Sequence, residues 1–278
     1  MNDAKSLRIS DEKCPDCGQP IKYGYIPILD KERAIECPCV TAKQAEEQKQ
    51  RIEKGVKYIR SQMRTLSGMK TRQRGISLCG ISSREGQKDA FEAAVEFVDR
   101  FSKSKNGKVK GLLFSGGVGS GKTLLSAAIL NTIIDNTEVS EHDAEGAGTS
   151  RFEYSPVRFT STVELFERLK STYSADNKET AQGIMSALKE CRVLALDDMG
   201  AEKPTEWVNE RLFEIIDYRY NEYLPVIAST NATPAELKTQ IGERSFDRLR
   251  EMCVFVAVTA KSQRVTAKVE PKERNQKA

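Results

Sequence analysis

The stretch that most constrains this chain's fold is residues 116–123, which read GGVGSGKT. It matches the phosphate-loop pattern G-x-x-x-x-G-K-[S/T], and it follows an apolar run, GLLFS, and leads into a helical run, TLLSAAILNTII. Glycines let such a loop wrap closely, so that backbone N–H groups and the amino terminus of the following helix face the phosphates. We expect Lys122 to reach the β- and γ-phosphates and the Thr123 hydroxyl to hold Mg²⁺. The predicted ATP-binding residues are Gly116, Gly117, Val118, Gly119, Ser120, Gly121, Lys122 and Thr123.

A second apolar run, VLAL at 193–196, ends in the two acids Asp197 and Asp198. ATP hydrolysis needs a magnesium ligand and an adjacent base at the carboxyl end of such a strand. We therefore predict that Asp197 binds the metal and that Asp198 polarises the attacking water. The alternative is that both acids cap the next helix. Asn231 follows the run PVIAST and is predicted to orient the same water through its amide, unless it only caps the helix TPAELK.

Five candidate strands alternate with helical stretches from residue 84 onward: GLLFS (111–115), VRFTS (157–161), RVLAL (192–196), PVIAS (225–229) and VFVAV (254–258). This alternation predicts an α/β fold with a mostly parallel sheet covered on both faces. One strand lies between the phosphate-loop helix and the acidic strand, which favours the additional-strand ATPases. The fold class is therefore expected to be a P-loop ATPase core with a five-stranded parallel sheet in the order of that class, 5-1-4-3-2.

Composition excludes several other classes. The 278 residues are 30% charged and 38% hydrophobic, which suits one sizeable soluble domain with a small appendage. No apolar run approaches the ~18 residues of a membrane helix, and the start, MNDAKSLRIS, lacks the core of a signal peptide. We therefore expect a cytoplasmic protein without a membrane partner. The single histidine, His142, lies in a loop-like stretch, which argues against histidine-based catalytic triads and two-histidine metal motifs.

Four of the seven cysteines lie in the first 39 residues, as Cys14-Pro-Asp-Cys17 and Cys37-Pro-Cys39. Two cysteine pairs separated by the length of a strand-turn-strand are typical of tetrahedral zinc coordination. We predict a structural zinc-binding module over residues 1–40, with a small hairpin between the two pairs. Disulfides are the alternative, which a cytoplasmic location disfavours.

Residues 41–80 are predicted to form a basic helix followed by a linker. Apolar residues recur at spacings of three and four over 41–66, although Gly55 within the helix costs about 1 kcal/mol of propensity. Residues 43–74 carry ten Lys or Arg against three Glu, a charge that can neutralise nucleic acid phosphates or simply form a solvated helix face. The helix either lies on its own domain or binds a partner. An ATPase domain is expected over 81–266 and a basic tail over 267–278; the acidic insert at 136–156 has no assigned role.

A resemblance to a known family rests on three stretches of the sequence. They are the run from Leu196 to Asn231, LDDMGAEKPTEWVNERLFEIIDYRYNEYLPVIASTN, and the later stretches IGERSFDRLREM and TAKSQR. Over residues 84–266 the chain resembles the AAA+ replicative helicase loaders of the DnaC and DnaI type, with the IstB transposition helper ATPases as cousins. The four-cysteine segment is similar to the zinc-bearing modules of DnaI-like loaders.

The resemblance implies a protein that self-associates on ATP, hydrolyses ATP weakly at subunit interfaces, and binds a replicative hexameric DNA helicase. It would help deposit that helicase on single-stranded DNA, through sequence-independent backbone contacts. Arg248 corresponds to the arginine supplied in trans to a neighbour's ATP, with Arg244 and Arg250 as alternatives, and Arg264 corresponds to the second sensor. As in the loaders, no carboxy-terminal helical lid is expected.

Two rival functions remain open at this point. One is a transposition helper ATPase of the IstB type, which uses the same ATPase with a transposase as its partner. The other is a zinc-dependent DNA-binding regulator in which ATP acts only as a conformational switch. The cysteine module favours the loader over the first, and the paired acids with Asn231 and Arg248 favour hydrolysis over the second.

Overall fold

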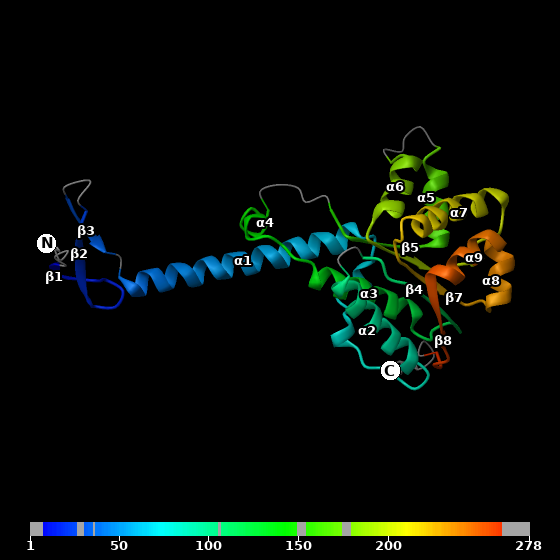
Figure 1. Ribbon diagram of the computed structural model, residues 1–278, viewed down its shortest axis with the longest axis horizontal. Helices are drawn as coiled ribbons and strands as arrows, with labels where there is room; N and C mark the ends of the chain where they lie inside the picture. The colour runs from blue at the N-terminus through cyan, green and yellow to red at the C-terminus, as the bar shows by residue number, and fades with distance from the viewer. Residues whose placement is uncertain are drawn as a thin grey trace, which may run out of the picture. The chain divides into compact units, whose positions relative to one another are not determined.

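The structure is a computed structural model that describes residues 8–26, 31–35, 37–104, 107–148, 154–173 and 179–262. The chain divides into two compact units (Figure 1). The smaller unit comprises residues 1–59 with 139–151, and the larger comprises residues 60–138 with 152–278.

A five-stranded parallel sheet forms the centre of the larger unit. Its strands are β4 (Gly111–Gly116), β5 (Val157–Ser161), β6 (Val193–Asp197), β7 (Val226–Thr230) and β8 (Cys253–Val258), in the order β5-β6-β7-β4-β8. Numbered along the chain, this is the order 5-1-4-3-2, so the predicted fold class is confirmed. Residues of β6 and β7 are buried at every position, because helices cover both faces of a parallel sheet.

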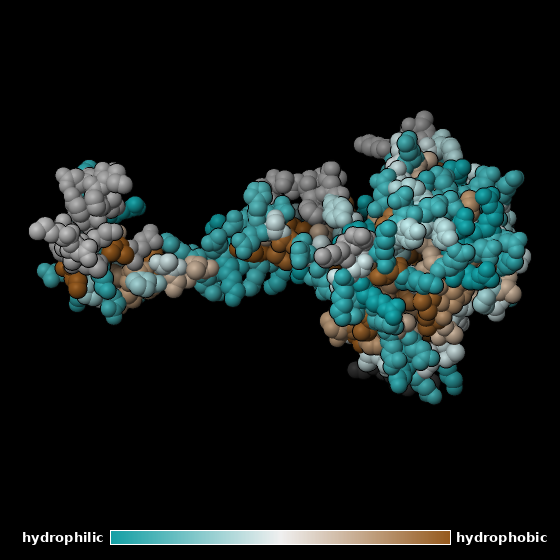
Figure 2. Space-filling view, in the orientation of Figure 1, coloured by the Kyte–Doolittle hydropathy of each residue, from teal (hydrophilic) through white to brown (hydrophobic). Residues whose placement is uncertain are grey.

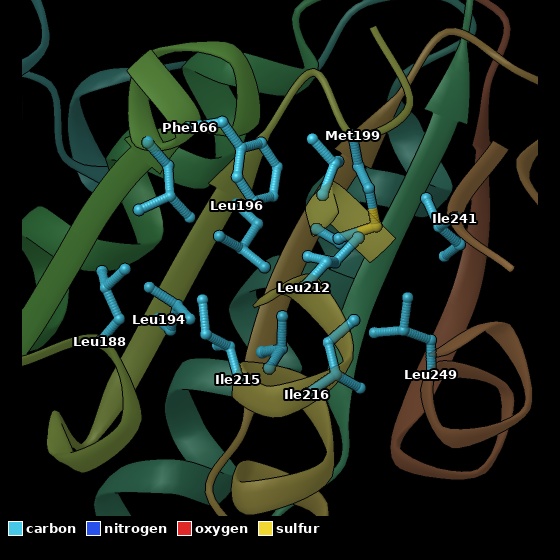
Figure 3. Packing of buried hydrophobic residues seen from close by; sticks show 14 of the residues in the cluster. Phe166, Leu188, Leu194, Leu196, Met199, Leu212, Ile215, Ile216, Ile241 and Leu249 are labelled. Carbon is cyan, nitrogen blue, oxygen red and sulfur yellow. The ribbon is translucent and has the colours of Figure 1, made fainter. Parts of the chain in front are cut away.

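Two layers of helices cover this sheet. The first layer, α2 (Lys88–Lys103) and α3 (Lys122–Asn136), contacts the strands and packs together. The second layer contributes the large apolar cluster in Figure 3, where Leu194 and Leu196 of β6 meet Leu212, Ile215 and Ile216. The helices of the second layer are α5 (Thr162–Ser171), α6 (Ala181–Glu190), α7 (Glu206–Asn221), α8 (Pro234–Ile241) and α9 (Glu243–Met252).

One charged side chain is wholly buried beneath these helices. The guanidinium of Arg219, on α7, donates hydrogen bonds to the carbonyl oxygens of Leu188 and Cys191, each at 2.9 Å, and of Pro225 at 2.8 Å. These carbonyls lie at the end of α6 and before β6 and β7. Arg219 therefore ties together the segments that enter the sheet from its amino-terminal edge.

Helix α1 (Pro38–Leu66) contains the predicted helix and begins three residues earlier. The segment after it, predicted as a linker, instead packs on the larger unit through two 3₁₀ turns, η1 (Thr71–Gln73) and η2 (Leu78–Gly80). The Asn131 side-chain amide donates to the carbonyls of Gln73 and Ile76, at 2.7 and 2.8 Å, and Phe159 N–H donates to the Ser67 carbonyl at 2.7 Å. The segment therefore covers the outer edge of β5, which would otherwise expose unpaired backbone groups.

The smaller unit contains a three-stranded antiparallel sheet of β1 (Arg8–Lys13), β2 (Pro20–Ile26) and β3 (Lys31–Ile35). The predicted hairpin corresponds to β2 and β3. Positions 41–51 of α1 are exposed throughout, and hydrophilic side chains dominate the surface along this helix in Figure 2. The insert adds a short helix, α4 (Glu141–Glu145), to this unit.

Candidate nucleotide site and cysteine cluster

The phosphate-loop residues 116–123 connect β4 to α3, as the sequence predicts. Gly119 and Gly121 have φ of 77° and 99°, a backbone region that favours glycine. Gly116 packs so closely on β8 that an added Cβ would lie 2.1 Å from the Val258 carbonyl oxygen. Backbone geometry and close packing therefore both require glycine in this loop.

Lys122 is 4% exposed and its ammonium group is held inside the loop. Its Nζ donates to the carbonyl oxygens of Gly116 and Gly117, at 2.7 and 2.9 Å, and to Asn231 Oδ1 at 2.8 Å. The structure thus brings Asn231, the residue predicted to orient the attacking water, from the end of β7 onto the predicted phosphate-binding lysine. This arrangement concentrates positive charge where a triphosphate is expected.

Thr123 and Asp197 meet beside the loop, where the Thr123 hydroxyl donates to Asp197 Oδ1 at 3.1 Å. Asp197 is 6% exposed, and burial raises the pKa of its carboxyl, while a hydrogen bond from Ser229 opposes that rise. A hydroxyl and a carboxylate are hard oxygen ligands of the kind that Mg²⁺ prefers, so this pair fits a magnesium ion bound together with substrate phosphates.

Asp198 adopts a left-handed backbone conformation, with φ of 52°, that several neighbours stabilise. Its N–H donates to Ser229 Oγ at 3.1 Å, and its carbonyl oxygen accepts from Thr162 Oγ1 at 3.0 Å. Its carboxylate accepts a longer bond, 3.4 Å, from the Asn231 amide. Strained backbone of this kind persists where the surroundings over-determine it, often at functional sites.

Two further side chains at this site, Ser229 and Gln87, were not predicted. Ser229 Oγ donates to Asp197 Oδ1 at 2.5 Å, so one hydroxyl bridges both acids. Gln87 Nε2 donates to the Ser120 carbonyl at 2.5 Å and borders a pocket of about 180 Å³ that Ile81, Phe91 and Leu124 also line. Neither Ser229 nor Gln87 belongs to a sequence motif: the pairing of β7 with β6 places Ser229, and the start of α2 places Gln87.

The structure describes three of the four arginines named in the sequence analysis, and all three lie on α9. Arg248, on α9, donates through Nε to Asp217 at 3.1 Å and lies 4.5 Å from the Tyr220 ring centroid. Arg244 lies over Phe213, and Arg250 pairs with Asp247 at 3.5 Å. Arg264 lies outside the described residues, but Ser262 lies so close to Gly119 that a Cβ there would clash. The chain leading to Arg264 therefore passes over the tip of the phosphate loop.

The four amino-terminal cysteines gather into one cluster in the smaller unit. Cys14 and Cys17 lie in the turn between β1 and β2, and Cys37 and Cys39 lie at the start of α1. Their sulfur atoms all lie within 4.8 Å of one another, with three separations of 3.3 to 3.5 Å. Tetrahedral zinc with Zn–S bonds of about 2.3 Å needs sulfurs about 3.8 Å apart, so the cluster fits a zinc ion.

The electrostatics of the cluster also favour a cation. Backbone N–H groups of Cys17 and Asp16 lower the pKa of the Cys14 thiol to about 7. Hydrogen bonds between the Cys39 thiol and the adjacent sulfurs of Cys17 and Cys37 raise the pKa of Cys39, because they stabilise its protonated form. A divalent cation would take the place of the shared protons, so all four cysteines could ligate as thiolates.

The sheet order, the phosphate loop and the acid pair together define a P-loop ATPase core of the AAA+ class. Within that class, the sequence model of IstB-like ATP-binding proteins matches residues 93–271, and the chain belongs to that family. Among the described residues, no helix has the length and apolar character to cross a membrane.

Helicase loaders are among the chain's relatives. It is 32% identical to the replicative helicase loader DnaI of Bacillus subtilis over 176 residues, covering 59% of this chain and 50% of DnaI. It is 25% identical to the loader DnaC of Escherichia coli over 166 residues, covering 60% of this chain and 59% of DnaC. The chain thus spans about half to six-tenths of these curated relatives.

Solved loader structures share the fold. The crystal structure of DnaI matches with a TM-score of 0.54 and 27% identity over 69% of this chain and 95% of that chain. The crystal structure of the DnaC helicase loader matches with a TM-score of 0.54 and 25% identity over 68% of this chain and all of that chain. These matches confirm the resemblance to the DnaC and DnaI loaders.

Proposed function

We propose that this protein is an ATP-dependent loader that binds a replicative hexameric DNA helicase and helps deposit it on single-stranded DNA. The similarity to DnaI, together with an intact phosphate loop and acid pair, is the observation that carries the proposal.

The ATP site supports turnover as well as binding. Lys122 and the loop amides would hold the triphosphate. The pocket beside Gln87, where Phe91 and Leu124 lie next to Ser82 and Arg84, would accept the adenine base. Mg²⁺, bound through Thr123 and Asp197, would neutralise phosphate charge. Asp198, supported by Ser229 and Asn231, would polarise the attacking water. A site used only as a switch has no need of such a base.

Arg248 and Arg264 complete the proposed catalytic set. We assign Arg248 to a neighbouring copy's ATP, because a planar, permanently charged guanidinium stabilises charge on the transferred phosphoryl group. Hydrolysis should therefore require self-association and be weak in a lone subunit.

Mixing Arg248→Ala with Asp198→Asn subunits tests this assignment, because some interfaces then pair an intact base with an intact arginine. Recovery of ATP hydrolysis in the mixture supports the assignment, and no recovery contradicts it.

The zinc module and the exposed first part of α1 are proposed as the helicase-binding arm. Zinc held by Cys14, Cys17, Cys37 and Cys39 would fix the small sheet, which has too few residues for a core of its own. The exposed, polar character of positions 41–51 suits a helix that presents the module to another protein.

Co-purification with a replicative helicase, with and without ATP, tests the function. The full chain should retain the helicase, and a chain starting at Ile52 should lose it while still binding ATP. That boundary keeps the buried Ile59 and Met63 of α1 in place. Helicase retention by the shortened chain would contradict the docking role, and failure of the full chain to bind any replicative helicase would contradict the proposed function.

The family match favours one second candidate, a transposition helper ATPase. In that case the same co-purification should recover a transposase instead of a helicase. The cysteine cluster remains the feature of this chain that favours the helicase.

A further inference from the structure

The amino-terminal edge of the sheet carries a groove of about 400 Å³ that no part of the ATPase mechanism uses. Its walls come from the segments that lead into β4, β7 and β8, and include Lys108, Lys110, Tyr220, Tyr223, Pro225 and Glu251. The phosphate loop follows the carboxyl end of β4. The groove and the nucleotide site therefore lie at opposite edges of the sheet.

Tyr223 is a conformational outlier in this groove. Its φ is 56°, and it occupies the position just beyond the end of α7 where glycine is usual. Its N–H bonds to the Tyr220 carbonyl at 3.2 Å, and the next N–H, of Leu224, bonds to the Arg219 carbonyl at 2.8 Å. A bulky side chain is unfavourable at positive φ, and this one is 63% exposed, so packing does not compensate. Burial of the ring therefore does not explain a tyrosine at this position.

Two lysines give the groove its charge. Lys108 Nζ lies 4.4 Å from the centroid of the Tyr223 ring, a cation–π contact that leaves much of the ring open to solvent. Across the described part of the chain, no carboxylate pairs with Lys108 or Lys110. Glu251, the acid of the groove, instead accepts the Tyr220 hydroxyl at 2.5 Å. The groove thus combines an exposed aromatic face with two cations available to an anion.

An aromatic ring beside unpaired cations recognises a base and its phosphate together, since every base has a π-face and every phosphodiester a charge. We propose that this groove binds single-stranded nucleic acid, with one base stacked on Tyr223 and the adjoining phosphates against Lys108 and Lys110. Two lysines, one on each side of Val109, suit successive phosphates of a strand better than a single free nucleotide. The groove would contact the DNA strand on which the helicase is placed, so its biological role rests on the proposed function. Binding of a strand in the groove itself requires neither helicase nor ATP.

Fluorescence anisotropy with labelled oligothymidylate tests the proposal on the full chain. Tyr223→Asn removes the ring yet suits the left-handed backbone, so the variant should fold. It should bind oligothymidylate about 5- to 100-fold more weakly, the loss of one stacked base. It should bind an abasic oligonucleotide as the wild type does, because only the stacking contact is gone. Tyr223→Phe should retain wild-type binding.

Charge is tested separately. Lys108→Gln should weaken binding to both the normal and the abasic strand. It should also reduce the slope of log affinity against log salt by about 0.7 for each phosphate that is no longer neutralised. Tyr173→Ala and Lys238→Gln serve as matched controls, an exposed tyrosine and a lysine outside the groove, and should bind as wild type.

Equal binding of oligothymidylate by wild type and Tyr223→Asn would overturn the proposal. So would displacement of the strand by thymidine monophosphate at equal concentration, which would make the groove a mononucleotide site. Failure of the helicase co-purification would overturn the proposed function and leave this result unchanged.

Discussion

At the residue scale, the candidate ATPase site depends on a serine that no motif identifies. Ser229 is fully buried on β7, donates to Asp197 and accepts from the Asp198 N–H. One hydroxyl thereby sets the positions of both the proposed magnesium ligand and the proposed base. Its effect on chemistry is indirect, because it acts by orienting the two acids.

Ser229→Ala should lower the rate of ATP hydrolysis about tenfold or more, because a hydrogen bond to a charged group contributes about 1.5–3 kcal/mol. ATP binding, which depends mainly on the phosphate loop, should change little. Steady-state phosphate release and fluorescent-ATP binding measure the two effects. Ser126→Ala is the matched control, since its buried hydroxyl has no hydrogen-bond partner. Unchanged hydrolysis in Ser229→Ala would contradict the positioning role.

The sequence predicted the residues that lie in contiguous motifs, and the structure brings Lys122, Thr123, Asp197, Asp198 and Asn231 together. Ser229 and Gln87 could not be predicted, because their roles depend on which strand neighbours β6 and on how α2 begins. The catalytic roles, and the arginines that a neighbouring copy would supply, remain predictions.

At the element scale, all five strands of the larger sheet and their order were predictable. Buried parallel strands appear as short apolar runs, and the position of the acidic strand indicates the topology. The polar composition of the segment at 67–80 predicts a linker, but the structure packs it on the sheet. Its carbonyl groups accept hydrogen bonds from Asn131 and from β5, which lie far along the chain. Long-range hydrogen bonds of this kind leave no local pattern.

The packing of α4 on α1 explains Gly55, a residue that is unfavourable within a helix. Gly55 is the point where α4 of the acidic insert approaches, and an added Cβ would lie 1.9 Å from the Ala144 carbonyl oxygen. Ala144 is buried, and Gln48 donates to Glu145 at 3.1 Å beside it. The insert thus packs on α1 within the smaller unit.

Gly55→Ala should therefore displace α4, although alanine favours an isolated helix by about 1 kcal/mol. Hydrogen exchange across residues 139–148 should become faster, while α1 itself stays helical. Lys54→Ala, at the adjacent exposed position, should leave the exchange unchanged. Protection of 139–148 equal to that of the wild type in Gly55→Ala would show that this packing is absent.

At the scale of the whole molecule, the two units should respond differently to loss of metal. Each chain should release one zinc ion on thiol modification, and chelation should unfold the cysteine module, since structural zinc supplies much of the folding free energy of such modules. ATP binding by the larger unit should persist. Cys17→Ser should lose the zinc, and Cys79→Ser, an exposed cysteine outside the cluster, should retain it. Full zinc occupancy in Cys17→Ser would contradict the four-thiolate site.

We propose that ATP hydrolysis at this site places a helicase ring on DNA. The amount of hexameric replicative helicase retained on circular single-stranded DNA, which has no ends to thread, tests this proposal. With this protein and ATP, retention should rise well above that of helicase alone, and with Lys122→Ala the increase should vanish. Equal retention with and without the protein would contradict the claim.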